Sequence, residues 1–550
     1  MAKRDPTLIE RALYLVSPRR GNDAYNRRLR RDYPGEQRER RRASGPQMSY
    51  ADHGASGTLN SLIGWITNPG NAEDDIDLNS SKLRERARDL YEGGGLARSG
   101  PETLTTSVVG WGIHPKPEID GEFLNMTDEA REEAERNILR EFKLWAENTM
   151  CDAERQQNFY GLQQLAFLSM LMSGDVFALF GMKENRRTPY QTTIRLLEAD
   201  RICNPNSSGS SESAESDGGG RIIDGVEIDK EGAVIRYHIA SRSPNAGSDS
   251  SELTWEKIDA YGSDTGYPNI LHIMTYERPE QRRGIPFVSA EIELIKQFSR
   301  YMNAELAGKV VSAMLTLFIT SKEDDGKAGM EDAVNEDEKV TDDELKLELA
   351  PGAIYDLPPG KDVTTVDPKR SDTQFESFVN TCITVIASSM GIPKEVLIKK
   401  YESNYTAARA ALLDFWRTVR VYRTRFNTAF NQPIYEQWLS EAVATGRIDA
   451  PGFFDDPAVR QAWCGCSWMG TSMGHVDPLK EVNAAAVRIA QNISTQEQEA
   501  SEYNGNDWAA NIRQRRRELE ALQEFNDLLS KMKGDDKPAP DDEDDDKEDE

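Results

Sequence analysis

One short motif in the chain has the spacing of a catalytic nucleophile. Residues 470–474 read Gly-Thr-Ser-Met-Gly and match the GxSxG pattern. A working nucleophile elbow needs a strand before it, a helix after it and a histidine base later in the chain. The only later histidine is His475, which is too close to fold back onto Ser472 as a base. The sequence therefore favours a surface turn over a hydrolase site.

The sequence also lacks recognisable phosphate-binding and metal-binding motifs. The glycine-rich residues 93–100 lack the Lys-Ser/Thr that completes a P-loop, and the sequence has neither HExxH nor an EF-hand loop. Cys464 and Cys466 stand beside Trp463 and Trp468, but four ligands at suitable spacing are not apparent. We expect a buried, reduced cysteine pair there, and no catalytic residue, metal or cofactor.

The composition narrows the class of protein. The 550 residues carry 67 Lys+Arg and 94 Asp+Glu, a net charge of −27, and 38% are apolar. This excludes a membrane protein, a collagen-like fibre and a disulfide scaffold, and it argues against a DNA-wrapping protein, which would be basic. Five cysteines fit a reducing compartment, and the charged N-terminus does not read as a signal peptide.

The charge is unevenly distributed. Residues 1–50 have a net charge of +7 and residues 534–550 a net charge of −9, which leaves −25 on the body between them. The basic N-terminus is either an arm for phosphates or acidic protein surfaces, or a solubilising disordered end. The acidic C-terminus reads as a disordered tail.

Hydrophobic periodicity predicts a mainly helical α+β protein. Residues 103–117 read as a strand or extended turn, and residues 176–275 as a strand-rich region with a hairpin turn at 229–232. Pro433 is expected to kink or end the last long helix of the middle region. Two segments read as solvated insertions, a flexible one at 206–220 and an acidic one at 321–344. Helices are expected over 78–92, 127–145, 157–172, 285–319, 373–390 and 407–439, and in the residues after 475.

Four collinear stretches, at 83–117, 271–306, 391–426 and 468–495, make the chain similar to the portal proteins of tailed bacteriophages, in particular the lambda-like family. They include an Arg-Pro…Gln-x-Arg-Gly-x-Pro core, an Asn-Tyr-x-x-x-Arg motif and an Asp-Pro-x-Lys-Glu motif. The resemblance implies a portal fold with wing, stem, clip and crown, assembled as a ring around a central channel. The implied segments are a basic flexible arm (1–60), wing (61–284), stem helix 1 (285–319), clip with the acidic insertion (320–371), stem helix 2 (372–390), tunnel loop (391–406), long wing helix and return (407–474), crown helices (475–530) and an acidic disordered tail (531–550).

The resemblance also implies where functional residues lie. The tunnel loop would face DNA in the channel, although its lysines could instead pair with neighbouring surface acids. The clip would dock the terminase motor, and arginines of the long wing helix would contact adjacent subunits, unless they form a solvated helix face. The candidates are Lys394, Lys399, Lys400, Tyr401, Asn404 and Tyr405 for the tunnel loop; Asp324, Asp325, Glu331, Asp332, Asp342 and Asp343 for the clip; and Arg409, Arg417, Arg420 and Arg423 for subunit contacts.

The resemblance further implies the partners and the role. The protein would be a non-enzymatic component of one capsid vertex, a twelve-membered ring built in the host cytoplasm, through which genomic DNA is packaged and later ejected. Its partners would be its own copies, double-stranded DNA, terminase, the major capsid and scaffold proteins and a tail or head-completion adaptor, with no membrane. Two alternatives are another capsid-assembly component and a DNA-packaging enzyme such as a terminase or nuclease, which the missing P-loop disfavours.

Overall fold

A computed structural model describes most of the chain between residues 70 and 534. The described ranges are 70–205, 214–215, 220–244, 253–313, 317–321, 361–365, 372–401, 405–474, 478–504 and 508–534, together with residues 9, 11, 24 and 25. The chain forms two compact units, Met1–Gly70 and Asn71–Glu550, and the second is described below. The expected basic arm, most of the 206–220 and 321–344 insertions and most of the acidic tail lie outside the described residues.

Helices from both halves of the sequence build one apolar core. The first four are α4 (Leu78–Glu92), which follows a π-turn at Glu73–Asp77, α5 (Leu96–Val108), α6 (Asp128–Ala146) and α7 (Phe159–Ser173). Thr127 and Asn158 cap α6 and α7, since their side chains accept the N–H groups of Ala130 and Gly161. The ring of Phe142 meets that of Trp438, from a much later helix, edge-on at a centroid distance of 4.9 Å. Burial of these large rings is the main stabilising contribution to the core.

The expectation of a strand over residues 103–117 is wrong for its first part. Residues 103–108 complete α5, and only His114–Pro117 form a strand, β1, which pairs antiparallel with β12 (Cys466–Met469). Leu104 and Val108, four residues apart, are fully buried on one face of α5. Their burial outweighs the modest helix propensity of the β-branched residues between them.

Two antiparallel sheets enclose a second, smaller core. One has the order β3-β2-β9, with β2 at Asp175–Met182, β3 at Thr192–Glu198 and β9 at Ile270–Met274. The other runs from β4 to β8, at Ala214–Glu215, Arg221–Ile223, Val226–Ile228, Val234–Ala240 and Trp255–Asp259. The predicted hairpin at 229–232 is confirmed, because β6 and β7 pair across it and the Asp229 N–H donates to the Ala233 carbonyl.

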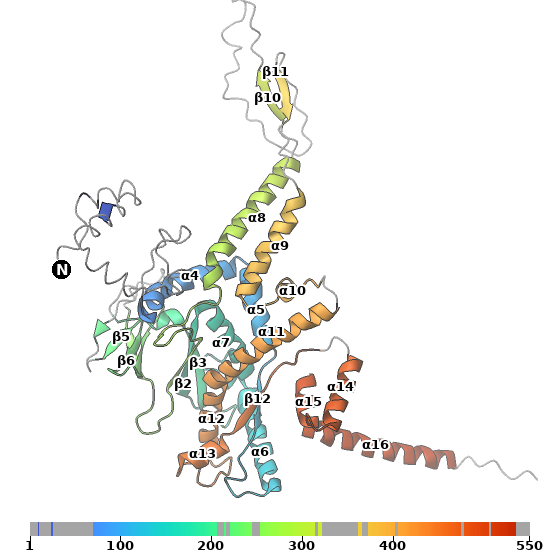
Figure 1. Ribbon diagram of the computed structural model, residues 1–550. Coiled ribbons are helices and arrows are strands. Elements are labelled where there is room, and N and C mark those ends of the chain that lie inside the picture. Colours follow the sequence, from blue (N-terminus) through green and yellow to red (C-terminus); the bar gives the residue numbers. More distant parts are fainter. Residues whose placement is uncertain are drawn as a thin grey trace, which may run out of the picture. The chain divides into compact units, whose positions relative to one another are not determined.

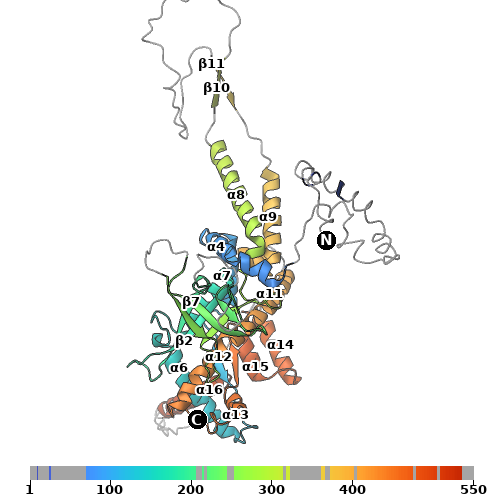
Figure 2. The same ribbon diagram turned by 90° about the vertical axis from the view of Figure 1, so that its left-hand side faces the viewer.

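The helix expected over 285–319 is shorter than predicted at both ends. It is α8, Ile292–Ala313, preceded by a 3₁₀ turn at Ser289–Glu291, and Leu317–Ser321 form strand β10, paired antiparallel with β11 (Lys361–Thr365). The residues before this turn bond elsewhere, since the Phe287 N–H donates to the Leu171 carbonyl of α7 at 2.9 Å. Helix α9, Asp372–Ser389, forms as expected. It lies beside α8 in both views (Figures 1 and 2), and the rings of Tyr301 and Phe378 meet at 4.9 Å.

Pro433 changes the helical register of the next long helix without ending it. Helix α11 (Tyr405–Phe426) passes through a π-turn at Asn427–Asn431 into α12 (Gln432–Ala444), and Pro433 lies in the first turn of α12. A π-turn next to the proline lets the backbone do without the missing donor. The helix therefore extends five residues beyond the expected end at 439.

The C-terminal part is helical, as predicted. Helix α13 (Pro457–Trp463) precedes β12, and α14 (Pro478–Ala490), α15 (Gln496–Asn504) and α16 (Trp508–Gly534) follow it. Within the described residues, no helix is both long enough and apolar enough to cross a membrane.

Candidate DNA-channel segment

The segment expected to be a tunnel loop contains a short helix. Helix α10, Lys394–Ile398, follows Pro393, and its Val396 and Leu397 side chains are buried. The Ser99 hydroxyl of α5 donates to the Leu397 carbonyl at 2.7 Å. The expectation of a loop throughout 391–406 is therefore wrong, since apolar burial and this bond hold 394–398 in helical form, and α11 begins at Tyr405.

A left-handed residue ends α10. Lys399 has φ 55° and ψ 34°, and the Lys400 N–H donates to the Glu395 carbonyl at 3.1 Å. Lys399, Lys400 and Tyr401 are exposed, whereas Lys394 at the helix start is partly buried. Three of the six predicted channel residues thus gather at one exposed end of α10. Asn404 lies outside the described residues, as do all six predicted clip acids.

The base of α9 fixes the position of α10. Ile386, Met390 and Ile392 are buried where α9 ends and the chain turns toward α10. Gly100 of α5 lies so close that a Cβ there would be 2.9 Å from the Met390 sulfur. The exposed end of α10 is therefore carried on a packed junction of α5 and α9.

The four arginines predicted as subunit contacts differ in their surroundings within one chain. Arg409 pairs with Glu481 of α14 at 2.8 Å. Arg417 and Arg420 are exposed; Arg417 lies 3.8 Å from Asp414 of α11, and Arg420 lies 3.9 Å from Glu502 of α15. Arg423 donates to the carbonyls of Val108, Ser107 and Thr471 at 2.8–2.9 Å, and burial together with the Arg420 charge lowers its pKa to about 10. Arg409 and Arg423 thus have roles inside the chain, and their part in subunit contacts stays a prediction.

The GxSxG segment and the Cys464–Cys466 pair, which could have carried chemistry, lie in surroundings that give them a structural role. The carbonyl of Thr471, in the GxSxG segment, accepts a hydrogen bond from Arg423, and β12 lies directly before the segment. Cys464 and Cys466 are free thiols, and burial raises the pKa of Cys464 to about 12 and also raises that of Cys466. Thiols with raised pKa values are poor nucleophiles. Among the described residues, no three His, Cys, Asp or Glu side chains are grouped to hold a metal ion.

A buried arginine just before α8 forms the most connected polar site in the described structure. Arg283 is fully buried; it pairs with Asp175 at 2.7 Å and with Asp224 at 2.9 Å. Its remaining N–H groups donate to the carbonyls of Ala199, Ile202 and Asp224 at 2.6–2.8 Å. All five guanidinium donors are thereby used. We call Arg283, Asp175, Asp224 and the residues bonded to them the Arg283 junction.

The Arg283 junction ties α8 to both sheets and to α4. Asp175 begins β2 and Asp224 lies in the β5–β6 turn, where its carboxylate accepts from the Ser80 hydroxyl of α4 at 3.1 Å and pairs with Arg84 of α4 at 3.5 Å. The Gly284 N–H donates to Asp175, and the Gly284 backbone touches that of Gly174, where a Cβ would be 2.0 Å from the Gly174 carbonyl oxygen. The sequence showed Arg283 only as part of the Gln-x-Arg-Gly-x-Pro core and gave its side chain no role.

Asp77, at the start of α4, is a further buried carboxylate of this region. It is buried, and neither of its carboxylate oxygens has a hydrogen-bond partner among the described residues. Burial and the nearby Asp224 carboxylate raise the pKa of Asp77 to about 7, and Arg283 opposes this only in part. Near neutral pH, Asp77 is thus partly protonated.

Asp77→Asn is expected to change how stability depends on pH. An unfolded-state aspartate has a pKa near ~3.9, so the folded chain binds an extra proton between that pH and about 7. The stabilising contribution is full at low pH and is lost as the pH rises through 7. At pH 8 the free energy of unfolding of the asparagine variant should exceed that of the wild type by about 2–4 kcal/mol, and at pH 5 the difference should be smaller.

Urea unfolding of both proteins at pH 5 and pH 8 measures this difference. Asp74→Asn, at an exposed position in the same turn, is the matched control and should leave the pH dependence of unfolding unchanged. Equal gains for Asp77→Asn at the two pH values would contradict the raised pKa.

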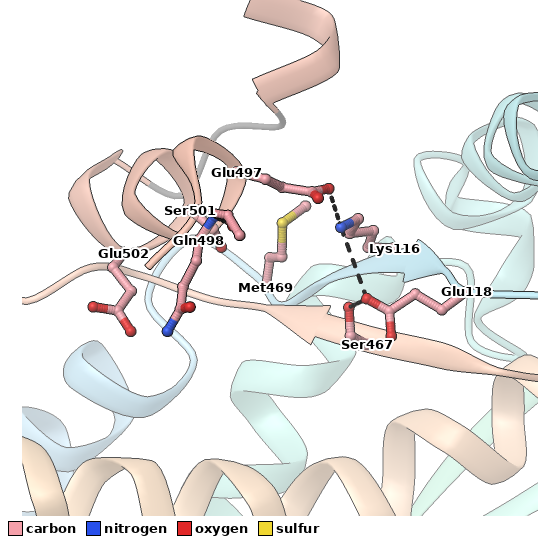
Figure 3. Close-up of a pocket in the computed structure, with 9 residues that line it drawn as sticks. Lys116, Glu118, Ser467, Met469, Glu497, Gln498, Ser501 and Glu502 are labelled. Atoms are coloured by element: carbon pink, nitrogen blue, oxygen red, sulfur yellow. Dashed lines mark hydrogen bonds and ion pairs between the residues drawn. The ribbon is translucent and has the colours of Figure 1, made fainter. Parts of the chain in front are cut away.

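A polar cavity separates the C-terminal helices from the β1–β12 pair. It measures about 300 Å³, and Lys116 of β1 reaches across it to Glu497 of α15, as Figure 3 shows. The Ser467 hydroxyl donates to Glu118 at 2.7 Å on the strand side. The cavity is lined by Lys116, Glu118, Ser467, Met469, Thr495, Glu497, Gln498, Ser501 and Glu502. Its mixed charges suit a polar contact between helices and strands better than an apolar ligand.

Comparison with known proteins identifies the class. The family model for the phage portal protein, lambda family, matches residues 59–423, about two thirds of the chain. The chain therefore belongs to the lambda family of phage portal proteins, and its function is that of a phage portal.

Relatives extend this likeness over most of the chain. It is similar to portal protein B of Escherichia phage lambda, at 24% identity over 486 residues that cover 84% of this chain and 88% of that protein. The portal protein of Escherichia phage N15 is also 24% identical, over 85% of this chain and 89% of that protein. A chain in the neck of a native gene transfer agent particle, computed with C12 symmetry, has a TM-score of 0.43 and 14% identity, covering 76% of this chain and 92% of that one.

Proposed function

We propose that copies of this chain form a ring, of twelve members in the virion, through which genomic DNA enters the capsid and later leaves it. The observation that carries this proposal, beyond family membership, is the exposed group Lys399, Lys400 and Tyr401 at the end of α10. Repeated around a ring, it would present a circle of cations to the phosphate backbone. No chemical step is assigned to the protein.

The charge of the chain suits passage of DNA rather than capture. A basic channel would release counterions and bind the duplex tightly. The body of this chain is acidic, with a net charge of −25 between residues 51 and 533. Charges act on DNA only within about 8–10 Å in physiological salt, so the residues that line the bore decide the outcome. An acidic wall with a few lysines would keep the duplex centred and mobile.

The partners follow from the same proposal. The segment 320–371 between α8 and α9 would dock the terminase during packaging and a tail or head-completion adaptor afterwards. Helices α8 and α9 would form the stem, residues 61–284 and 407–474 the wing, and 475–530 the crown. The basic N-terminal arm would meet scaffold or capsid protein, or DNA inside the head. Assembly would take place in the host cytoplasm and place the ring at one capsid vertex.

The double variant Lys399→Ala and Lys400→Ala is expected to lower the yield of DNA-filled particles several-fold, because each ring loses 24 cations at the proposed contact. Phage or procapsids complemented with the variant are assayed for packaged DNA protected from nuclease. Packaging and retention should recover with Lys399→Arg and Lys400→Arg, which keep the charge. Lys143→Ala with Lys230→Ala, at exposed positions of α6 and the β6–β7 turn, is the matched control. Wild-type DNA retention in the alanine variant would remove these lysines from the proposed channel contact.

The ring itself is tested by native mass and electron microscopy of the purified chain. Twelve copies of the 61.8 kDa chain give a ring of about 742 kDa with a central hole. Because isolated portals can close with other numbers of copies, the count is made in intact particles. A monomer with ATPase or nuclease activity would contradict the proposal.

A further inference from the structure

The last described helix leaves an unusual amount of apolar surface uncovered. Helix α16 has 27 residues, about 40 Å at 1.5 Å per residue, and every side chain described from 511 to 528 is exposed. Its apolar residues Ile512, Leu519, Leu522, Phe525 and Leu528 are 48–58% exposed. Helices in proteins owe most of their stability to the packing of such a face, so α16 lacks the partner that its sequence calls for.

The spacing of these residues selects another helix as the partner. Leu519, Leu522, Phe525 and Leu528 follow one another at intervals of three, so they form a single ridge that winds at about 45° to the helix axis. Each step of three residues turns by about 60° around the helix axis, so a second helix that crosses at about 20° covers neighbouring members of the ridge such as Leu522 and Phe525. A membrane surface would require a straight apolar stripe along one side instead.

The distribution of charge along α16 indicates that its partner is α16 of another copy. Residues 508–517 contain four arginines and no acid, and residues 518–527 contain four acids and no lysine or arginine. Pairs within the helix join the two halves at their boundary, such as Arg516 with Glu520 at 3.3 Å. A second α16 displaced along the axis by about ten residues would place its acidic half against the basic half of the first.

We propose that α16 of one copy packs against α16 of the next through the apolar ridge, with the basic half of one helix beside the acidic half of its neighbour. The inference rests on the proposed ring, for which it names one contact between copies. Each helix offers one half to each neighbour, so the contact is head-to-tail and can repeat around a closed ring. The rotational symmetry of the proposed ring sets the head-to-tail direction, and the charge segregation sets the displacement between the two helices. In this register the ridge, which lies in the acidic half, packs on the basic half of the neighbour, which contains Ile512.

Hydrogen exchange on the full-length assembled chain tests the apolar part. Amides of 511–528 are expected to exchange at least about tenfold more slowly in the assembly than in the variant Leu522→Gln with Phe525→Gln. Both positions are exposed within one chain, so the variant should fold. Phe123→Gln with Phe454→Gln replaces exposed apolar residues elsewhere and is the matched control. Its α16 amides should keep wild-type protection.

Charge exchange tests whether the basic half of one helix lies beside the acidic half of its neighbour. One variant carries Arg515, Arg516 and Arg517 all replaced by Glu, and the other carries Glu518, Glu520 and Glu524 all replaced by Arg. Each alone should lose protection of 511–528, since like charges then face each other, and an equimolar mixture should regain it. Failure of the mixture to recover, wild-type protection in either variant alone, or protection that appears only when another virion protein is added would overturn the contact. A ring with unprotected α16 refutes this contact alone, whereas a wild-type chain that stays monomeric refutes the ring as well.

Discussion

Arg283→Met is expected to destabilise the protein by about 3–5 kcal/mol, the range for removing one partner of a buried ion pair. The substitution leaves Asp175, which is fully buried, without its guanidinium partner, and it removes the donors to three backbone carbonyls. Arg283 holds the pKa of Asp175 well below its usual range, and its loss leaves the buried carboxylate with only His272 and the Gly284 N–H as polar contacts among the described residues. Urea unfolding and the melting temperature measure the change.

Two further variants separate the ion pair from a general loss of packing. Arg282→Met, at the adjacent and only partly buried position, should change stability by less than about 1 kcal/mol. Adding Asp175→Asn to Arg283→Met should recover part of the loss, since the double variant no longer buries an unpaired charge at that position. Strict additivity of the two single changes would show that the pair is not coupled and would contradict the role given to the Arg283 junction.

Gly284→Ala is expected to cost about 3 kcal/mol, at the upper end for overpacking a closed site. The added methyl group would be 2.0 Å from the Gly174 carbonyl oxygen and 2.9 Å from the Asp175 nitrogen. These neighbours are backbone atoms at the start of β2, which side-chain rotation cannot move. Relief requires the two segments to separate, and that would also loosen Arg283 from Asp175. Thermal unfolding and the yield of assembled rings report the loss.

Gly121→Ala is the matched control for this substitution. The nearest atom to its added methyl group would be the Cδ of the Arg131 side chain, at 3.0 Å, and this flexible side chain can shift away. Its stability should stay within about 0.5 kcal/mol of the wild type. If Gly284→Ala were equally mild, the close backbone approach between residues 174 and 284 would be refuted.

The Arg283 junction also determines how the proposed stem and channel segment are held in a portal. Arg283 and Gly284 precede α8 by nine and eight residues, and the Arg283 junction fixes that point to β2, to the β5–β6 turn and through Asp224 to Ser80 and Arg84 of α4. Weakening it should therefore change the position of α8 and of α10 beyond α9, without touching a residue proposed to meet DNA. The expected phenotype is a loss of assembled or packaging-competent rings together with a loss of stability.

Sequence reasoning was reliable for elements with strong periodicity and unreliable where tertiary contacts decide. It predicted α6, α7, α9 and the β6–β7 hairpin, whose apolar spacing and caps are local properties. It misassigned residues 103–108 as extended, because β-branched residues locally favour extended over helical structure. The burial of Leu104 and Val108, which stabilises the helix, is visible only in the fold. Sequence reasoning extended α8 through residues that form β10, because an apolar run of β-branched residues fits either structure.

In the candidate channel segment, too, part was predictable from the sequence and part depends on tertiary contacts. The exposed lysines at the end of α10 could be proposed from a family resemblance and their charge, and their exposure agrees with a surface role. The α10 helix beneath them depends on Ser99, which lies 298 residues earlier in the chain. No local pattern contains that contact.

The sequence by itself determined the helical periodicity, the acidity of the body, the lack of a P-loop and membership of the portal family, since each is a property of composition or of ordered motifs. Only the tertiary structure decided that Arg283, Asp175 and Asp224 share one buried site, that Asp77 is left without a partner and that α16 is left uncovered. The physical reason is that burial and long-range pairing join residues far apart in the chain, 108 positions for Arg283 and Asp175 and 298 for Ser99 and Leu397. The free energies of these contacts depend on distances that no local pattern contains.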